Sequence, residues 1–339
     1  MKQISQRPPG AVRVRRGGWT ESEHRVHAVV VNDRGELQWA VGDPNRATFL
    51  RSAAKPLQAL PILDDGVADR FDFTSSELAL CCASHNSEPR HVQTVAGLLE
   101  RLGLDESALA CGGHPPLRPE EGLRLAGEGR RPGSLESNCS GKHTGMLALA
   151  VAHGWPVVGY EKEEHPVQRR MKAEVARWTD LDPARLETGV DGCGVTCVRA
   201  PLDRIAASFA RLGVAARTEG SARRIVRAMV EHPGMVAGLG RLDTAVMRAT
   251  GGTVFAKVGA EGVYAAGIPE AGLGLALKIE DGGWRAADVA FVHVLDQLGY
   301  TDATRDDEVS SFRRPTIVNT RGESVGRIDP EFELVRHGE

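Results

Sequence analysis

A serine and a lysine stand three residues apart in the segment RSAAKPLQAL, at Ser52 and Lys55. Residues at positions i and i+3 lie on one face of a helix, so these two side chains could touch. Pro56 follows directly, and a proline fits only the first turn of a helix because it has no N–H to donate. We therefore expect a helix that begins close to Ser52. The spacing is consistent with a nucleophilic hydroxyl beside its own base, or with a plain helix start.

A nucleophilic serine also needs a proton route to the leaving group and donors for the oxyanion. Ser84 lies in the segment CCASHNSEPR, in a Ser-x-Asn pattern, and Lys257 lies in AKVGAEG, in a Lys-x-Gly pattern on an expected strand. Ser-x-x-Lys, Ser-x-Asn and Lys-x-Gly follow one another in this order in serine β-lactamases and penicillin-binding proteins. Taken singly, Ser84 is also typical of a helix end, and Lys257 of a solvated strand.

A second group of residues has the donor types of a zinc site. Ligand chemistry alone favours thiols and an imidazole from the segments SLESNCSGKHTGML and GVDGCGVTC: Cys139, His143, Cys193 and Cys197. Cys139 and His143 would share a helix face at i and i+4. The glycine before Lys142 instead predicts a turn at Ser140–Gly141, which would disrupt that spacing.

These residues must be positioned by a sheet and a helical region. The segment RVHAVVVNDRGELQWAVGD predicts a hairpin around Asn32–Gly35, and the segment from Thr253 to Asp281 predicts three further strands separated by turns. Between them, helical signals dominate, including a capping box from Thr74 to Glu77. We expect one domain over residues 1–339, with a sheet from about 18–50 and 252–330 and a helical block over about 51–251. This arrangement is typical of an α/β (α+β) fold.

Composition narrows the class of protein. The 339 residues are 41% hydrophobic and 26% charged, with a net charge of −3, which gives no indication of a nucleic-acid or membrane partner. The longest apolar run, MLALAVA, is too short to span a bilayer. Six cysteines in a long chain that opens without an apolar leader favour free thiols or metal ligands over disulfides, and hence a cytoplasmic location.

Five segments together resemble the rhizobial-type L-asparaginases, a zinc-containing Ser-Lys family: RSAAKPLQALP, CASHNSEPRHV, NCSGKHTGMLA, DGCGVT and FAKVGAEGVYAAGIPEAGLGLALKIEDG. The resemblance covers roughly residues 18–328. It implies a serine β-lactamase- and glutaminase-like fold, in which both chain ends supply an antiparallel sheet and the middle supplies helices. It also implies a homodimer that acts on L-asparagine.

The resemblance assigns roles to individual positions. Its two Ser-Lys pairs fall on Ser52 with Lys55 and on Ser84 with Lys257. Its zinc ligands fall on Cys139, Lys142 and Cys193, and its substrate-binding positions on Arg51 and Asp191. Between the two ligand sets we favour the one with Lys142, and we expect His143 to line the pocket beside the substrate.

The expected reaction is hydrolysis of L-asparagine to L-aspartate and ammonia through an acyl-enzyme. Lys55, made neutral by burial and by its cationic neighbours, would take the proton of Ser52. Three alternatives stay open at this point: a β-lactamase- or peptidase-like serine hydrolase, a zinc hydrolase with a metal-bound hydroxide, and a non-catalytic zinc-binding protein. The preference between asparagine and glutamine also stays open.

Overall fold

The computed structural model describes residues 9–218, 220–305 and 307–337, which form two compact units. Unit 1 comprises Met1–Ala53, Ala200–Val214 and Ala245–Glu339, and unit 2 comprises Ala54–Arg199 and Ala215–Thr244. The single domain expected over residues 1–339 stays a prediction. Among the described residues, no helix has both the length and the apolar character that crossing a bilayer requires.

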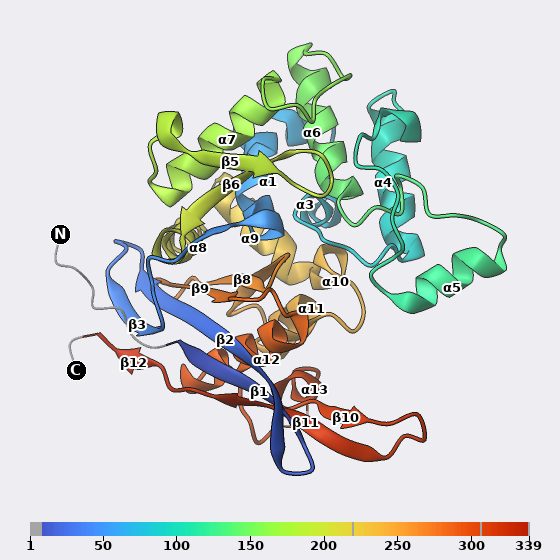
Figure 1. Cartoon of the computed structure of the whole chain (residues 1–339). Coiled ribbons are helices and arrows are strands. Elements are labelled where there is room, and N and C mark those ends of the chain that lie inside the picture. Colours follow the sequence, from blue (N-terminus) through green and yellow to red (C-terminus); the bar gives the residue numbers. More distant parts are fainter. Residues whose placement is uncertain (1–8, 219, 306, 338–339) are drawn as a thin grey trace. The chain divides into compact units, whose positions relative to one another are not determined.

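Unit 1 is built on an antiparallel sheet to which both chain ends contribute (Figure 1). Nine strands of the described chain belong to it: β1 (Gly10–Arg16), β2 (Trp19–Asn32), β3 (Leu37–Val41), β7 (Phe255–Gly259), β8 (Val263–Ile268), β9 (Leu273–Ile279), β10 (Thr316–Val318), β11 (Ser324–Glu331) and β12 (Val335–Arg336). Seven of them follow the order β10-β11-β1-β2-β9-β8-β7, and β3 pairs with both β2 and β12. This confirms the predicted sheet from both chain ends.

The hairpin predicted around Asn32–Gly35 joins β2 to β3, and the Gly35 N–H donates to the Asn32 carbonyl at 2.9 Å. The sheet begins earlier than the predicted residue 18, because β1 is itself a strand. Val12 and Val14 of β1 are buried, while the alternate residues Arg13 and Arg15 form ion pairs with Glu331 on β11. Two valines between arginines are too short a pattern to predict a strand, and the pairing with β11 stabilises it.

Helices cover this sheet. The remaining elements assigned wholly or mainly to unit 1 are β4 (Ala47–Phe49), the 3₁₀ turn η1 (Arg51–Ala54), α8 (Leu202–Ala215), α11 (Leu242–Ala249), α12 (Trp284–Gln297) and α13 (Ser310–Arg313). Helix α12 packs against β1, β2, β8, β9 and β11. Its apolar residues therefore bury one face of the sheet, which supplies much of the core of unit 1.

Unit 2 is mainly helical, which confirms the predicted helical middle of the chain. Its helices are α1 (Lys55–Asp64), α2 (Val67–Arg70), α3 (Ser75–Cys81), α4 (Pro89–Arg101), α5 (Pro119–Gly127), α6 (Ser140–His153), α7 (Pro166–Thr179), α9 (Ser221–Glu231) and α10 (Pro233–Val236), with 3₁₀ turns η2 (Glu106–Ala108) and η3 (Pro183–Arg185). The predicted capping box from Thr74 to Glu77 is confirmed at the start of α3. Helices α1, α3, α6, α7 and α9 pack on one another.

Two features of unit 2 differ from the prediction. The helical block also contains strands β5 (Glu187–Val190) and β6 (Thr196–Pro201), which pair antiparallel over residues 187–190 and 196–199. The turn expected at Ser140–Gly141 is wrong, because α6 already begins at Ser140. Gly141 has a packing role instead: a Cβ atom there would lie 2.3 Å from the carbonyl oxygen of Leu80. Only a glycine lets α6 approach the end of α3 this closely.

Candidate functional site

The ten residues predicted from the sequence divide between the two units. Unit 1 carries Arg51, Ser52 and Lys257, and unit 2 carries Lys55, Ser84, Cys139, Lys142, His143, Asp191 and Cys193.

In unit 1, Arg51 and Ser52 lie in the turn η1, which runs directly into α1. Both residues are partly exposed, whereas Leu50 before them is fully buried. The backbone of Arg51 is left-handed, with φ at +51°, a conformation that is unfavourable for any residue with a Cβ atom. Such strain persists where the surrounding structure imposes it, and it is common at active sites.

This strain predicts different stabilities for two variants that both lack the guanidinium. Arg51→Gly should be more stable to urea unfolding than Arg51→Ala by about 1 kcal/mol, because glycine adopts a positive φ without steric cost. Equal unfolding midpoints for the two variants would show that Arg51 stores no backbone strain.

Lys257 is fully buried on β7, and its Nζ donates to the carbonyl oxygen of Val258 at 3.0 Å. The glycine two residues later has a steric function: a Cβ atom on Gly259 would lie 2.7 Å from the carbonyl oxygen of Leu50. The end of β7 therefore passes against the backbone just before Arg51. Within unit 1, the Lys-x-Gly segment and the turn that carries Ser52 are close neighbours.

In unit 2, Lys55 connects two of the predicted groups. Its side chain is fully buried, and its Nζ donates to the hydroxyl of Ser84 at 2.9 Å, to the thiol sulfur of Cys139 at 3.2 Å and to the carbonyl oxygen of Ala83. The family resemblance had paired Ser84 with Lys257 rather than with Lys55. The contact joins α1, the segment after α3 and the residue before α6, and no local pattern could have predicted it.

The residue after Ser84, His85, lies in a loop and is fully buried. Its Nδ1 accepts a hydrogen bond from the Ser87 N–H at 3.1 Å, so its Nε2–H donates to the hydroxyl of Ser140 at 2.9 Å. Burial, and secondarily the neighbouring His91, hold the pKa of His85 well below its usual range. A neutral His85 therefore links the loop of Ser84 to the first residue of α6.

Three of the predicted residues form a buried cluster at the N-terminal end of α6. The Nζ of Lys142 lies 3.1 Å from the sulfur of Cys193, and the thiols of Cys193 and Cys139 are hydrogen-bonded to each other. That hydrogen bond lowers the pKa of Cys139 well below its ordinary value, and the positive charges of Lys55 and Lys142 add to the effect. The same bond, together with burial, raises the pKa of Cys193.

The Lys142 amine is affected by the same two cysteines. Burial opposes the charge on Lys142, but the electrostatic interactions with Cys193 and Cys139 outweigh burial and raise the pKa of the amine. Asp191 contributes to the same field and lies in the turn between β5 and β6. Its carboxylate accepts the Gly192 N–H at 2.7 Å and is partly exposed, so it remains accessible to a ligand.

The donor types of this cluster suit zinc. Two cysteine sulfurs and an amine nitrogen approach one another in a buried place, and thiolates are preferred zinc ligands. The alternative set based on Cys139, His143, Cys193 and Cys197 is not assembled: within the described residues, no group of three or more His, Cys, Asp and Glu side chains could hold a metal. Cys81, Cys82 and Cys111, all within the described part of the chain, form no disulfide.

His143, expected to line the substrate pocket, is fully buried on α6. Its Nδ1 lies 2.6 Å from the hydroxyl of Tyr160, a residue that the sequence pattern did not single out. Burial, followed by the charges of Lys142 and Lys55, holds the pKa of His143 well below its usual range. The imidazole is therefore neutral, and the charges of these two lysines act on it.

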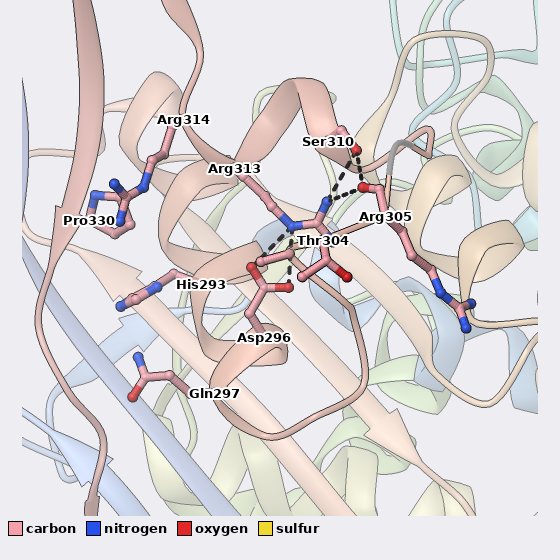
Figure 2. A pocket seen from close by; sticks show the side chains of 10 residues that line it. His293, Asp296, Gln297, Thr304, Arg305, Ser310, Arg313, Arg314 and Pro330 are labelled. Carbon is pink, nitrogen blue, oxygen red and sulfur yellow. Dashed lines mark hydrogen bonds and ion pairs between the residues drawn. The ribbon is translucent and has the colours of Figure 1, made fainter.

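A pocket of about 670 Å³ lies elsewhere in unit 1, beside α12 and α13 (Figure 2). None of its lining residues is a predicted site residue. Arg313 projects into it, but its guanidinium is bonded to the carboxylate of Asp296 at 3.1 Å and to the hydroxyl of Ser310 at 3.1 Å. The arginine thus ties the start of α13 to α12.

Comparison with known proteins identifies the class of enzyme. A family model described as L-asparaginase II matches residues 12–330, and the enzymes of this family are amidohydrolases. The chain belongs to the L-asparaginase II family, and the expected L-asparaginase activity is confirmed at this level. No curated protein matches the sequence.

Solved structures also match the chain. One is a β-lactamase from Mycobacterium bovis, which is 19% identical over 81% of this chain and 95% of that chain, with a TM-score of 0.42. Another is the native form of Mglu, which is 16% identical over 84% of this chain and 63% of that chain, with a TM-score of 0.46.

Proposed function

We propose that this L-asparaginase works through a serine nucleophile and an acyl-enzyme. The observation that carries the proposal is the buried Lys55 amine, which lies within hydrogen-bond distance of both Ser84 and Cys139. A lysine in this position can exchange protons with a hydroxyl. Through Cys139 it also contacts the cluster of Cys139, Lys142 and Cys193. Ser52 lies in the turn that leads directly into the helix of Lys55.

In the first step, the Ser52 oxygen attacks the side-chain carbonyl carbon of asparagine, and the serine proton passes to Lys55, which must be neutral at that moment. Backbone N–H groups of Ser52 and of a residue just after Lys257 hold the oxyanion. The C–N bond then breaks, and the nitrogen leaves as ammonia with a proton delivered through Ser84 and Lys257. Water hydrolyses the resulting ester and releases aspartate.

The substrate carries an α-carboxylate and an α-ammonium group, and each needs an opposite charge. Arg51 fits the carboxylate and Asp191 fits the ammonium group, and both side chains are partly exposed. His143 contributes a neutral polar contact. With its two charged α-groups, a free amino acid matches these partners better than a β-lactam does, and this favours the asparaginase mechanism over the serine β-lactamase alternative.

Zinc belongs to the proposal as a bound cofactor, held by Cys139, Lys142 and Cys193. Bound zinc would supply positive charge that organises the pocket and the substrate. Lys142 has to lose a proton before its amine can act as a ligand, and metal binding drives the deprotonation of ligands.

Lys142→Ala should lower the zinc content, measured by elemental analysis after dialysis, to well below one equivalent. His143→Ala should retain the zinc and weaken turnover or substrate affinity. Lys172→Ala, which removes a partly exposed lysine paired with Glu163, serves as the control for the loss of a lysine. Loss of zinc only with His143→Ala would contradict the ligand set and leave the serine mechanism untouched.

The cellular setting completes the proposal. None of the six cysteines, all of which the structure describes, forms a disulfide, and this suits a reducing compartment such as the cytoplasm. We propose a homodimer with no nucleic-acid or membrane partner, which sedimentation and light scattering can test.

The substrate range is tested by ammonia release from asparagine, glutamine and β-aspartyl peptides, with nitrocefin hydrolysis measured in parallel. Asparagine should give the highest kcat/KM. A higher kcat/KM for nitrocefin than for asparagine would favour the β-lactamase alternative, and zinc binding without turnover of any of these compounds would favour the non-catalytic one. Activity retained by Ser52→Ala would favour the zinc hydrolase.

A further inference from the structure

His143 and Tyr160 form a buried pair within unit 2. The imidazole is fully buried on α6, and the phenol ring of Tyr160 is 1% exposed. The Nδ1 of His143 lies 2.6 Å from the Tyr160 hydroxyl oxygen, and the two rings meet edge to face with their centroids 5.5 Å apart. The short hydrogen bond and the buried rings give the imidazole a fixed orientation.

The other contact of the tyrosine oxygen determines the direction of this hydrogen bond. The backbone N–H of Ala110 donates to the Tyr160 oxygen at 2.9 Å, and a backbone N–H can only donate. If Nδ1 also donated, the buried phenolic hydrogen would have no acceptor among the described residues. Every group has a partner when Tyr160 donates its hydrogen to Nδ1, and buried polar groups are nearly always satisfied.

The direction of this bond fixes the tautomer of the histidine. An Nδ1 that accepts a hydrogen bond carries no proton, so the proton of the neutral imidazole is on Nε2. The Nε2 atom is itself buried and has no hydrogen-bond partner among the residues that the structure describes. His143 is next to Lys142 in sequence, and the charge of Lys55 acts on its ring. A buried donor that has no partner among the described residues points to a ligand that supplies an acceptor.

We propose that Tyr160 is a positioning residue, which holds His143 as the Nε2–H tautomer so that this N–H donates to a carbonyl or carboxylate oxygen of the bound amino acid. The choice of amino acid as ligand rests on the proposed function; the tautomer does not. The proposal has a second consequence: an Nε2 that carries a proton has no lone pair for a metal, so Tyr160 also keeps His143 out of the zinc ligand set.

The tautomer can be read directly from the ¹⁵N chemical shifts of the two imidazole nitrogens in histidine-labelled protein, with His143 assigned by its absence in His143→Gln. The wild-type protein should show a protonated Nε2 and an unprotonated Nδ1. Adding L-aspartate, the reaction product, should shift the Nε2–H signal. Tyr160→Phe keeps the ring and removes the hydroxyl, so both tautomers should become populated, and kcat/KM for asparagine should fall about tenfold.

Tyr264→Phe is the matched control, because this buried tyrosine donates its hydroxyl to Asp288 at 3.1 Å in unit 1. It should leave both the tautomer and kcat/KM unchanged. A protonated Nδ1 in the wild-type protein would overturn the proposal, and so would an Nε2 signal that aspartate does not shift. If asparagine is not hydrolysed but the Nε2–H signal is present and moves with aspartate, the tautomer assignment is supported and the proposed serine mechanism fails.

Discussion

Replacing Ser52 with alanine is expected to lower kcat for asparagine hydrolysis by at least about a thousandfold, because catalytic units lose most of their rate when the nucleophile is removed. The side chain is partly exposed in the turn η1, so the loss of one hydroxyl leaves no cavity in the core. The thermal unfolding midpoint should therefore stay close to that of the wild type. Ammonia release under saturating asparagine measures the effect.

Ser221→Ala is a suitable control for this variant. Ser221 is also partly exposed and is the first residue of α9, but it belongs to no predicted site. Its activity should equal that of the wild type. If Ser52→Ala retains a rate within about tenfold of the wild type, corresponding to a change of only about 1.4 kcal/mol in the activation free energy, Ser52 is not the nucleophile.

Replacing Lys55 with arginine should be nearly as damaging. The Lys55 amine has three acceptors around it, Ala83, Ser84 and Cys139, in a fully buried place. A planar guanidinium is larger than an ammonium group and cannot reproduce this arrangement of three hydrogen bonds. It also stays protonated at working pH and so cannot accept the proton of a serine. We expect kcat to fall by at least about a hundredfold, within the range of general-base effects.

Thermal unfolding must be measured for this variant, because overpacking a buried site destabilises a protein by about 1–3 kcal/mol. Lys172→Arg provides the comparison at a partly exposed lysine, where both activity and stability should be unchanged. A cooperatively folded Lys55→Arg protein with the wild-type rate would show that position 55 supplies only positive charge.

Local sequence patterns predicted the elements that depend on neighbouring residues. The hairpin at Asn32–Gly35 and the capping box from Thr74 to Glu77 were predictable because turn and cap residues act on their own backbone. The three strands between residues 255 and 279 were predictable because β-rich runs alternate with glycine-containing turns.

Features that depend on distant residues were not predictable in this way. Strand β1 has only two buried valines in its own pattern and exists through its pairing with β2 and β11. The prediction of a turn at Gly141 was wrong. The Leu80 carbonyl oxygen that requires a glycine at this position lies on another helix, so the local sequence does not show it. Tyr160 gave no signal at all, since a single tyrosine reveals its hydrogen-bond partner only in the folded chain.

In the candidate site too, the local geometry was predictable from the sequence, and the contacts between distant residues were not. The sequence predicted that Lys55 sits one turn from Ser52, and the turn η1 followed by α1 agrees with that local geometry. It did not predict that the amine of Lys55 contacts Ser84 and Cys139, because these residues are 29 and 84 positions away in the chain. Site chemistry that relies on such contacts appears only when the helices pack.

The pairing of β1 with β11 has a consequence for how the protein is made. Arg13 and its partner Glu331 are 318 residues apart, so the ribosome must release nearly the whole chain before the sheet of unit 1 can be completed. Until then, β1 presents an unpaired edge, and such edges promote aggregation. Segments of unit 2 emerge earlier and make mostly helical, more local contacts, which form faster. Nascent chains that stall before residue 324 should therefore depend on chaperones, and slower translation of the last strands should lower the yield of folded enzyme.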